Sequence, residues 1–375
     1  MPDTITTAHA TGTEATSAID QLLRELATEQ PAAILFFSST DHDGGRIAHA
    51  LCAAYPSAQV IGCTTAGEFT ERETGTGGIA AIALPCSKAT RAAGALADFE
   101  QGVEEGVAGA VAELERQLGG KLSELDPAHH VGLVLIDGTH GVEERVNELL
   151  GNAAPFLSFI GGSAGDDLKF AETHVFAGEV ASSSGAALLV LELKVPYAIV
   201  KTCSFAPTGT RFRVTRVDVD ERIVWELDGR PAVQAYADAL GVTPAGLDSS
   251  AFMRSPVGLM IDGEPWIRSP QQVVDGGGLK FYCQILDGID IDLMQSTDLI
   301  GETRNAFRNA AHELGDAPAG GVLFNCILRR LEIDAEGHQG AFLDAIGVCP
   351  MGGFHTYGES YVGHINQTLT GLLIG

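Results

Sequence analysis

The chain has 375 residues, which is too long for one typical domain and enough for two substantial hydrophobic cores. Hydrophobic residues make up 45% of the sequence and charged residues 19%, a composition typical of globular proteins that argues against global disorder. With 23 Lys and Arg against 49 Asp and Glu, the net charge is −26, and a surface of this sign repels phosphate backbones and anionic lipid, so that nucleic-acid binding is disfavoured.

The N-terminal residues 1–16 have neither a basic start nor an apolar core, so they do not read as a signal peptide, and we expect a disordered lead-in. The longest apolar runs, such as 186–191, are far shorter than the roughly 20 residues of a membrane helix. We therefore expect a cytoplasmic protein without membrane insertion. Its seven cysteines are scattered without a CxxC pair, which indicates neither a disulfide framework nor a structural zinc site.

Apolar periodicity in the first half predicts alternating helices and strands. The expected elements are helix 17–29, strand 33–37, helix 45–54, strand 59–63, strand 79–84, helix 103–118, strand 131–136, helix 142–150 and strand 156–160. The β-α-β order around 33–63 implies a parallel strand pair. From residue 173 the pattern changes to short strands, expected to be antiparallel, at 173–176, 186–193, 198–203 and 211–218.

The second half repeats this mixture of helices and strands. We expect helix 231–240, strands 257–261, 279–286 and 289–294, a helix from 296 or 297 to 314, strand 322–327, helix 339–346 and strand 365–374. The triplet 276–278 lacks the spacing of a dinucleotide-binding loop and predicts a hairpin. The fold class is mixed α/β, or α+β, with a lead-in and first helix at 1–30 and two domains at 31–229 and 230–375, each a mixed β-sheet with packed helices.

A hydroxyl residue, a spacer, a glycine and an acid occur together three times, and the first two copies directly follow strand-like runs. The copies are Thr65-Ala66-Gly67-Glu68, Ser163-Ala164-Gly165-Asp166 and Thr356-Tyr357-Gly358-Glu359. Backbone N–H groups beside a glycine can hold an anion, and a neighbouring carboxylate complements an ammonium group. This combination suits a zwitterion such as an amino acid. The alternative is that each copy is a tight turn whose hydroxyl and acid cap nearby backbone.

Other side chains could also carry chemistry. Asn325 and Arg329 follow an apolar strand, and the guanidinium could pair with a ligand carboxylate or with a protein acid. His355 and His364 bracket the third acidic loop and could ligate a metal or haem iron, or be ordinary polar residues. Cys63 lies on a glycine-rich turn without a nucleophile motif, which favours a buried inert thiol.

The chain resembles the FIST sensory family, which combines an N-terminal and a C-terminal FIST domain. In the first half the resemblance is carried by residues 60–68 (VIGCTTAGE) and 159–167 (FIGGSAGDD). In the second half it is carried by 324–329 (FNCILR), 356–359 (TYGE) and 366–370 (NQTLT). It covers nearly the whole chain, from about residue 31 to residue 375.

The resemblance implies a signal-input module rather than an enzyme, binding small ligands such as amino acids and regulating a partner such as a histidine kinase. Because the FIST-like segments leave only a short lead-in, we expect a stand-alone protein, similar to bacterial haem proteins that sense nitric oxide; a homo-oligomer is left open. Haem is then a candidate cofactor, with His355 or His364 as its ligand. The ligand-binding residues expected in a shared pocket are Cys63, Thr65, Gly67, Glu68, Gly162, Ser163, Asp166, Asn325, Arg329, Tyr357, Glu359 and Asn366.

Two other functions remain open from the sequence. An enzyme acting on a small polar substrate would use Glu68, Asp166 or Glu359 as a base, and would need one carboxylate with a raised pKa in a closed pocket. A pure interaction scaffold would have a shallow pocket and acidic loops whose mutation is silent.

Overall fold

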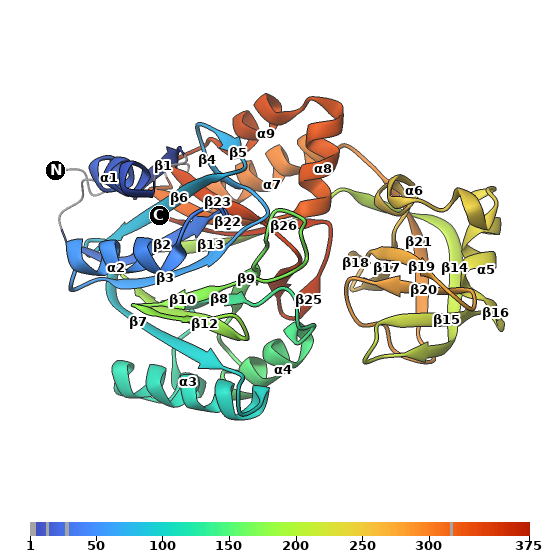
Figure 1. Ribbon diagram of the computed structural model, residues 1–375, viewed down its shortest axis with the longest axis horizontal. Coiled ribbons are helices and arrows are strands. Elements are labelled where there is room, and N and C mark those ends of the chain that lie inside the picture. The colour runs from blue at the N-terminus through green and yellow to red at the C-terminus, as the bar shows by residue number, and fades with distance from the viewer. Residues whose placement is uncertain (1–4, 13–14, 27–29, 316–317) are drawn as a thin grey trace. The chain divides into compact units, whose positions relative to one another are not determined.

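The computed structural model describes residues 5–12, 15–26, 30–315 and 318–375. They divide into two compact units (Figure 1). Unit 1 comprises Met1–Lys201, Thr303–His364 and Leu369–Gly375, and unit 2 comprises Thr202–Glu302 and Ile365–Thr368. The chain therefore leaves unit 1 to build most of unit 2, returns to unit 1, and contributes residues 365–368 to unit 2 before it completes unit 1.

Unit 1 is built from three mixed β-sheets whose strands are arranged in equivalent orders. Sheet 1 has the order β1 (Thr6–Thr11), β6 (Gly78–Pro85), β2 (Pro31–Ser38), β3 (Gln59–Thr64), β10 (Val175–Ala177) and β11 (Val180–Ser182). Sheet 2 has the order β7 (Ala89–Asp98), β12 (Gly185–Leu193), β8 (His130–Ile136), β9 (Phe159–Ser163), β24 (Glu359–Tyr361) and β25 (His364–Ile365). Sheet 3 has the order β13 (Tyr197–Cys203), β26 (Thr368–Ile374), β22 (Gly320–Cys326), β23 (Met351–Thr356), β4 (Glu68–Thr70) and β5 (Thr74–Gly75).

The element order shows that unit 1 is an internal triplication. Repeat A runs β1, α1 (Ala15–Leu26), β2, α2 (Gly44–Ala54), β3, hairpin β4–β5 and β6. Repeat B runs β7, α3 (Val103–Leu118), β8, α4 (Glu143–Ala153), β9, hairpin β10–β11 and β12. Repeat C runs β13, α7 (Leu299–Glu313), β22, α8 (Ile327–Glu336), α9 (Gln339–Ile346), β23, hairpin β24–β25 and β26, and it is interrupted after β13 by unit 2.

Each repeat contributes a parallel strand pair, namely β2–β3, β8–β9 and β22–β23. Each repeat also gives its hairpin to another repeat's sheet. Strand β10 of repeat B pairs with β3, β24 of repeat C pairs with β9, and β4 of repeat A pairs with β23. The three repeats are thus joined in a cycle by exchanged hairpins.

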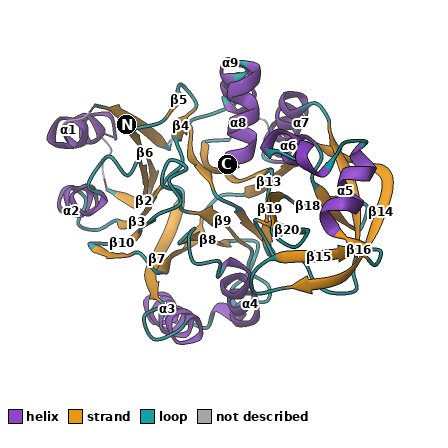
Figure 2. Cartoon of the chain, turned by 45° about the vertical axis from the view of Figure 1, so that its right-hand side comes forward, coloured by secondary structure: helices purple, strands orange, loops and turns teal. Residues whose placement is uncertain are grey.

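One shared core lies where the inner faces of the three sheets meet. Because side chains of a strand alternate between faces, every second residue of the central strands points into it. Phe37 of sheet 1 contacts Phe324 and Phe354 of sheet 3 with ring centroids 6.5 and 4.8 Å apart, and Leu133 and Leu189 of sheet 2 join the same cluster. Helices cover the outer faces: α1 and α2 pack on sheet 1, and α3 and α4 pack on sheet 2 (Figure 2).

Unit 2 is an antiparallel sheet with two helices, α5 (Ala232–Leu240) and α6 (Ser249–Arg254). Its strand order is β18 (Glu264–Arg268), β17 (Val257–Ile261), β21 (Asp290–Ser296), β14 (Phe205–Asp218), β15 (Ile223–Leu227), β20 (Gly278–Phe281) and β19 (Pro270–Val274), with β16 (Arg230–Pro231) paired to β15. Tyr236 and Phe252 from the helices pack with Leu279 and Phe281 in its core.

The mixed α/β class, the parallel pair β2–β3, and the hairpin at residues 276–278 confirm the sequence predictions. The disordered lead-in is wrong for residues 6–11, which form β1 and pair with β6, because the small side chains of Ala8 and Ala10 pack fully buried beneath α1. Residues 1–4, 13–14 and 27–29 of the predicted lead-in and first helix lie outside the described part.

Other expected boundaries need correction. The strand predicted at 279–286 ends at Phe281, α7 begins at Leu299 rather than at 296 or 297, and β26 begins at Thr368 rather than at 365. The strand expected from residue 211 begins at Phe205. Several strands were not predicted, among them β7, β15, β18 and β23, because their sequences are short or rich in alanine, glycine and charged residues, which carry little strand signal.

Candidate functional site

The three hydroxyl-x-Gly-acid copies occupy equivalent places in the three repeats. Each begins at the carboxyl end of the second strand of a parallel pair, that is, at the end of β3, β9 or β23. The copies also meet in space through backbone hydrogen bonds. Gly165 N donates to Thr64 O (3.0 Å), Ser163 N donates to Gly358 O (2.8 Å), and Ala66 N donates to His355 O (3.1 Å). The prediction that these loops converge is therefore confirmed within unit 1.

Glycines in these copies and directly before the second copy are required by backbone conformation or by close approach. Gly67 has a φ of +108°, which side-chain-bearing residues rarely adopt. A Cβ on Gly162 would lie 2.5 Å from the Thr356 side chain, and a Cβ on Gly165 would lie 2.5 Å from Ala66 N. The loops thus pack backbone to backbone, with no room for a ligand between them at these points.

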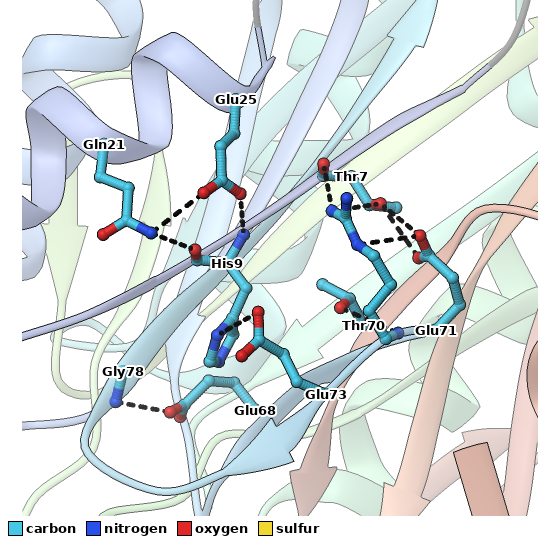
Figure 3. Close-up of polar contacts among 10 residues, drawn as sticks. Thr7, His9, Gln21, Glu25, Glu68, Thr70, Glu71, Glu73 and Gly78 are labelled. Carbon is cyan, nitrogen blue, oxygen red and sulfur yellow. Dashed lines mark hydrogen bonds and ion pairs between the residues drawn. The ribbon is translucent and has the colours of Figure 1, made fainter.

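In repeats A and C the acid folds back onto its own hydroxyl residue. Thr65 Oγ1 donates to Glu68 Oε2 (3.0 Å), and Thr356 Oγ1 donates to Glu359 Oε1 (2.5 Å). Gly78 N donates to the other carboxylate oxygen of Glu68 at 2.5 Å (Figure 3). Both carboxylates are fully buried. These two copies therefore act as turn-stabilising devices, the alternative left open by the sequence.

Burial raises the pKa of Glu68 to about 7, although the hydrogen bonds from Gly78 and Thr65 favour its charged form. On β1 the buried side chain of His9 lies nearby, with its Nδ1 atom 3.2 Å from Glu73 (Figure 3). A carboxyl with a pKa near neutrality is what a general base would need. Glu68, however, is enclosed by protein and does not line either pocket described below.

Repeat B differs, because its acid holds a loop instead of its own serine. Ser163 Oγ donates to Glu143 (3.2 Å), and Asp166 accepts hydrogen bonds from the backbone N–H groups of residues 170–172 (2.6–3.1 Å) and from the Tyr357 hydroxyl. Burial opposes ionisation of Asp166, but these hydrogen bonds outweigh it and hold the pKa below its ordinary value. Asp166 is thus a structural carboxylate and a poor general base at neutral pH.

Beside Asp166 lies a pocket of about 560 Å³. It opens at the carboxyl ends of β2 and β3, where α/β sheets usually place their ligands. Its walls come from two repeats: the β2–α2 connection and Thr64 belong to repeat A, and the segment from Asp166 to Ala181 belongs to repeat B. The lining residues are Thr40, His42, Asp43, Gly44, Gly45, Thr64, Asp166, Lys169, Ala171, Glu172, His174, Phe176 and Ala181.

A second pocket of about 440 Å³ lies between α1 and α2 and shares Asp43 and Gly45 with the first. It is lined further by Thr16, Ile19, Asp20, Arg46, His49 and Ala50. Arg46 donates from Nη2 to Thr16 at 3.2 Å across it. The two pockets therefore adjoin at the first turn of α2.

At the equivalent place in repeat C, buried side chains form a hydrogen-bonded chain. Arg329 Nη2 donates to Thr303 Oγ1 (2.7 Å) and its Nε donates to Asn325 Oδ1 (2.9 Å). The Asn325 amide then faces His355 Nδ1 (2.9 Å), which leaves Nε2 as the donor toward Thr74 Oγ1 (3.3 Å). Arg329, Asn325 and His355 are at most 1% exposed, so this set stabilises the interior of unit 1.

The surroundings of His355 do not fit haem iron. Both ring nitrogens have protein partners, and the ring packs between Phe69 and Phe342 with centroids 5.0 and 6.4 Å away. Burial, together with the nearby charges of Arg330 and Arg329, lowers the pKa of His355 well below its usual value, so the ring is neutral. Among the residues that the structure describes, no group of three or more His, Cys, Asp or Glu side chains is placed to hold a metal ion.

The remaining predicted residues lie apart from the pocket. Cys63 is a fully buried thiol in the shared core, and burial raises its pKa well above the ordinary value. His364 is buried in unit 1 at 3% exposure. Asn366 belongs to unit 2, where its Oδ1 accepts a hydrogen bond from Ser269 N at 3.4 Å. Of the predicted set, Asp166 is the residue that lines one of the two pockets described here.

Sequence reasoning missed most of the pocket wall, including Thr40, His42, Lys169 and His174. One signal could have found the first two: the polar run 38–45 (SSTDHDGG) separates a buried strand from a helix, which is the usual position of a site in an α/β fold. Lys169 and His174 carry no such signal, because they reach the pocket only through the exchange of the β10–β11 hairpin.

Comparisons with known proteins identify the family. The FIST N domain model matches residues 32–230 and the FIST C domain model matches residues 232–361. An uncharacterized protein of Methanocaldococcus jannaschii, MJ1623, is 25% identical over 310 residues, which cover 74% of this chain and 58% of that protein. This chain thus spans a little over half the length of that relative. None of the helices in the described residues is long and apolar enough to cross a membrane. The chain belongs to the FIST family of sensory domains.

Proposed function

We propose that this protein senses a small polar molecule, held in the pocket between repeats A and B, and passes its occupancy to a separate signalling protein such as a histidine kinase. Membership in a family of sensory domains supports the general role. The observation that carries the location is the pocket itself. Its volume of about 560 Å³ lies in the range of small-molecule sites, about 300–1,000 Å³, and it adjoins the motif copy whose acid does not fold back onto its own hydroxyl.

The pocket wall suits an amino-acid-like ligand. Gly44 and Gly45 begin α2, where N–H groups have no partner within the helix and the helix dipole favours an anion. The Lys169 ammonium, also in the wall, adds a positive charge for a ligand carboxylate. Asp43 and Glu172 supply negative charge for a ligand ammonium group. Phe176 gives the pocket an apolar side that can pack against a ligand side chain.

The place of this pocket in the fold, and not only the residues that line it, favours it as the ligand site over the buried motif loops. In repeat C the equivalent strand ends hold the buried Arg329, Asn325 and His355. In repeat B the equivalent strand ends hold the buried side chains of Glu143 and Asn147. Glu143 accepts a hydrogen bond from Ser163, and Asn147 donates one to Ser360 at 3.1 Å. The strand ends of repeat A border the pocket instead.

A ligand screen with a pocket-filling variant tests this proposal. We expect amino acids or their derivatives to raise the melting temperature of the protein, and Ala181→Trp, which places an indole in the pocket, to abolish that shift. Ala108→Trp, at an exposed position of α3 away from the pocket, is the matched control and should keep the shift. A ligand that stabilises both variants equally would place the binding site elsewhere.

The signalling half needs a separate measurement. The purified protein should change the autophosphorylation rate of a cognate histidine kinase, and the Ala181→Trp variant should change it without responding to ligand. Loss of all kinase regulation in the Ala108→Trp control would show that the effect depends on fold integrity and not on the pocket.

A further inference from the structure

One segment of the pocket wall, residues 167–172, differs from its counterparts in the other repeats. In repeats A and C the acid of the motif is itself the first residue of the next strand, at Glu68 in β4 and Glu359 in β24. In repeat B, residues 167–174 intervene between Asp166 and β10. An insertion confined to one copy of a repeated scaffold, placed on a pocket, is the pattern of a functional loop.

The backbone of this segment is strained. Asp167, Leu168 and Phe170 have φ values of +56°, +65° and +50°, a region that non-glycine residues seldom occupy. Such conformations are unfavourable for residues with a side chain, so this one persists only where surrounding contacts hold it. A strained segment of this kind relaxes when some of those contacts are removed.

Three sets of contacts hold the segment: the Asp166 carboxylate binds the N–H groups of residues 170–172, and two further sets come from the β2–α2 connection and from Tyr357. Toward the β2–α2 connection, Asp167 accepts from Ser39 Oγ (2.8 Å) and Lys169 Nζ donates to Thr40 Oγ1 (2.8 Å); we call these two hydrogen bonds the clasp. The Lys169 ammonium also lies 3.6 Å from Asp41.

Toward repeat C, Tyr357 holds the other side. Its hydroxyl accepts from Leu168 N (2.8 Å) and donates to Asp166, and its ring stacks on Phe170 with centroids 4.6 Å apart. The C-terminal end is fixed as well, because Thr173 donates from Oγ1 to Asp137 at 2.6 Å. The Tyr357 side, both ends and the Ser39 half of the clasp are therefore tied to buried groups. The other half of the clasp depends on Lys169, whose side chain is 54% exposed.

The clasp and a ligand compete for the same ammonium group. Resting on the function proposed above, we propose that residues 167–172 form a strap whose Lys169 leaves Thr40 when a ligand anion takes its ammonium group, so that Ser39 alone holds the clasp side while the strap stays anchored at Asp166 and Tyr357. Pocket occupancy is thereby converted into a local change of backbone conformation. Such a change needs a ligand that interacts differently with the two positions of the strap, and the contact to Lys169 supplies that difference.

Hydrogen exchange measured by mass spectrometry tests the strap without any ligand. Ser39→Ala and Lys169→Met each remove one hydrogen bond of the clasp, and we expect the amides of Asp167 and Lys169, which bond backbone carbonyls, to exchange about tenfold faster in each variant. The amides of Leu168 and residues 170–172, which bond Tyr357 and the Asp166 carboxylate, and those of α2 and α3 should be unchanged. Lys194→Met is the matched control, since Lys194 is another lysine whose ammonium bonds at 2.8 Å, to Cys86 O, and it should leave the strap unchanged. Unchanged exchange in both clasp variants, or faster exchange across all of unit 1, would overturn the inference.

The ligand arm uses a mixture of the common L-amino acids at millimolar concentration. We expect faster exchange of the amides of residues 167 and 169 in the native protein, and no further increase in Lys169→Met. A mixture that raises the melting temperature but leaves strap exchange unchanged overturns the strap and leaves the proposed function standing. If the clasp variants exchange faster as expected, but the mixture changes neither the melting temperature nor the strap exchange, two hypotheses fail together. These are the amino-acid class of ligand and the release of the strap by a ligand.

Discussion

The hydroxyl of Tyr357 donates a hydrogen bond to the carboxylate of Asp166, which precedes it by 191 residues in the chain. The same hydroxyl accepts from the backbone N–H groups of Asp166 (3.2 Å) and Leu168 (2.8 Å). One phenol of repeat C thus fixes the start of the pocket wall that repeat B contributes. Burial and the Asp166 carboxylate raise the pKa of Tyr357, so it remains a donor at any physiological pH.

Removing that hydroxyl should be costly. Tyr357→Phe leaves two backbone N–H groups without their acceptor, so we expect a loss of about 1–3 kcal/mol in the free energy of unfolding, measured with urea. Tyr55→Phe is the control, because Tyr55 packs partly buried beside the α1–α2 core, and its change should cost less than about 0.5 kcal/mol. Equal losses in the two variants would contradict the role assigned to the hydroxyl.

Gly165 should not tolerate even one additional carbon. A Cβ there would lie 2.5 Å from Ala66 N and 2.8 Å from Ala66 Cβ, so Gly165→Ala must push the first two motif loops apart, at a cost on the order of 3 kcal/mol. Gly109→Ala, in the interior of α3 with open space around its Cβ, should instead stabilise the protein by about 0.5–1 kcal/mol. Thermal denaturation of both variants checks the opposite signs.

Glu68 should make stability fall as the pH rises toward neutrality. Burial raises its folded-state pKa from 4.5 to about 7, so the folded state binds this proton more tightly than the unfolded state. The unfolding free energy therefore declines between pH 4.5 and 7, by about 3 kcal/mol from this group alone. Glu68→Gln keeps a neutral acceptor for Gly78 N and should remove the decline.

The difference between wild type and Glu68→Gln isolates this effect from other titrating groups. His9 acts with the opposite sign, because burial lowers its pKa and so favours the folded state as the pH rises, even though Glu73 opposes this shift. Asp167 and Arg330 also act on Glu68, in opposite directions. We measure the unfolding free energy of both proteins by chemical denaturation at pH 5, 6, 7 and 8, and expect that of Glu68→Gln to rise relative to wild type as the pH increases. If the two unfolding free energies stay a constant amount apart, Glu68 is ionised throughout this range.

His355 should affect stability and not haem chemistry. Its nitrogens bond Asn325 and Thr74 in a fully buried position, so His355→Ala should cost about 2–4 kcal/mol in unfolding free energy through an unpaired amide and a cavity. Titration of the native protein with haemin should give no Soret band that depends on this residue. A Soret band present in the native protein, absent in His355→Ala and retained in Asn325→Ala would restore the haem assignment.

Local signals predicted much of the fold. The helices at α3 and α9 and the strands at β2, β3 and β6 are close to their predicted bounds, because each is a run with clear periodicity or a continuous buried strand. The triplication could not be read in the same way. Its third copy is split by unit 2, and strands such as β7 (ATRAAGALAD) and β23 (MGGFHT) owe their structure to pairing partners distant in sequence.

The candidate site was predictable in its motifs and not in its chemistry. The recurrence of the motif pointed correctly to loops that converge, since Gly165 N donates to Thr64 O and Ala66 N donates to His355 O. It did not reveal that Glu68 and Glu359 bond their own threonines, because residue identity does not say which way a carboxylate turns. Arg329 looked like a ligand-binding guanidinium, yet its observed partners Thr303 and Asn325 come from tertiary packing.

The exchanged hairpins impose an order on folding. Hairpin β4–β5 is synthesised early, but its partner β23 follows about 280 residues later, after the Thr202–Glu302 segment of unit 2. Until then the edge of β4 is unpaired, a state that favours aggregation and places unit 1 among slowly folding topologies with many long-range contacts. A nascent chain halted at residue 230 would carry repeats A and B without the hairpin exchange to repeat C. Unit 1 is therefore complete only when its last strand, β26, pairs with β22.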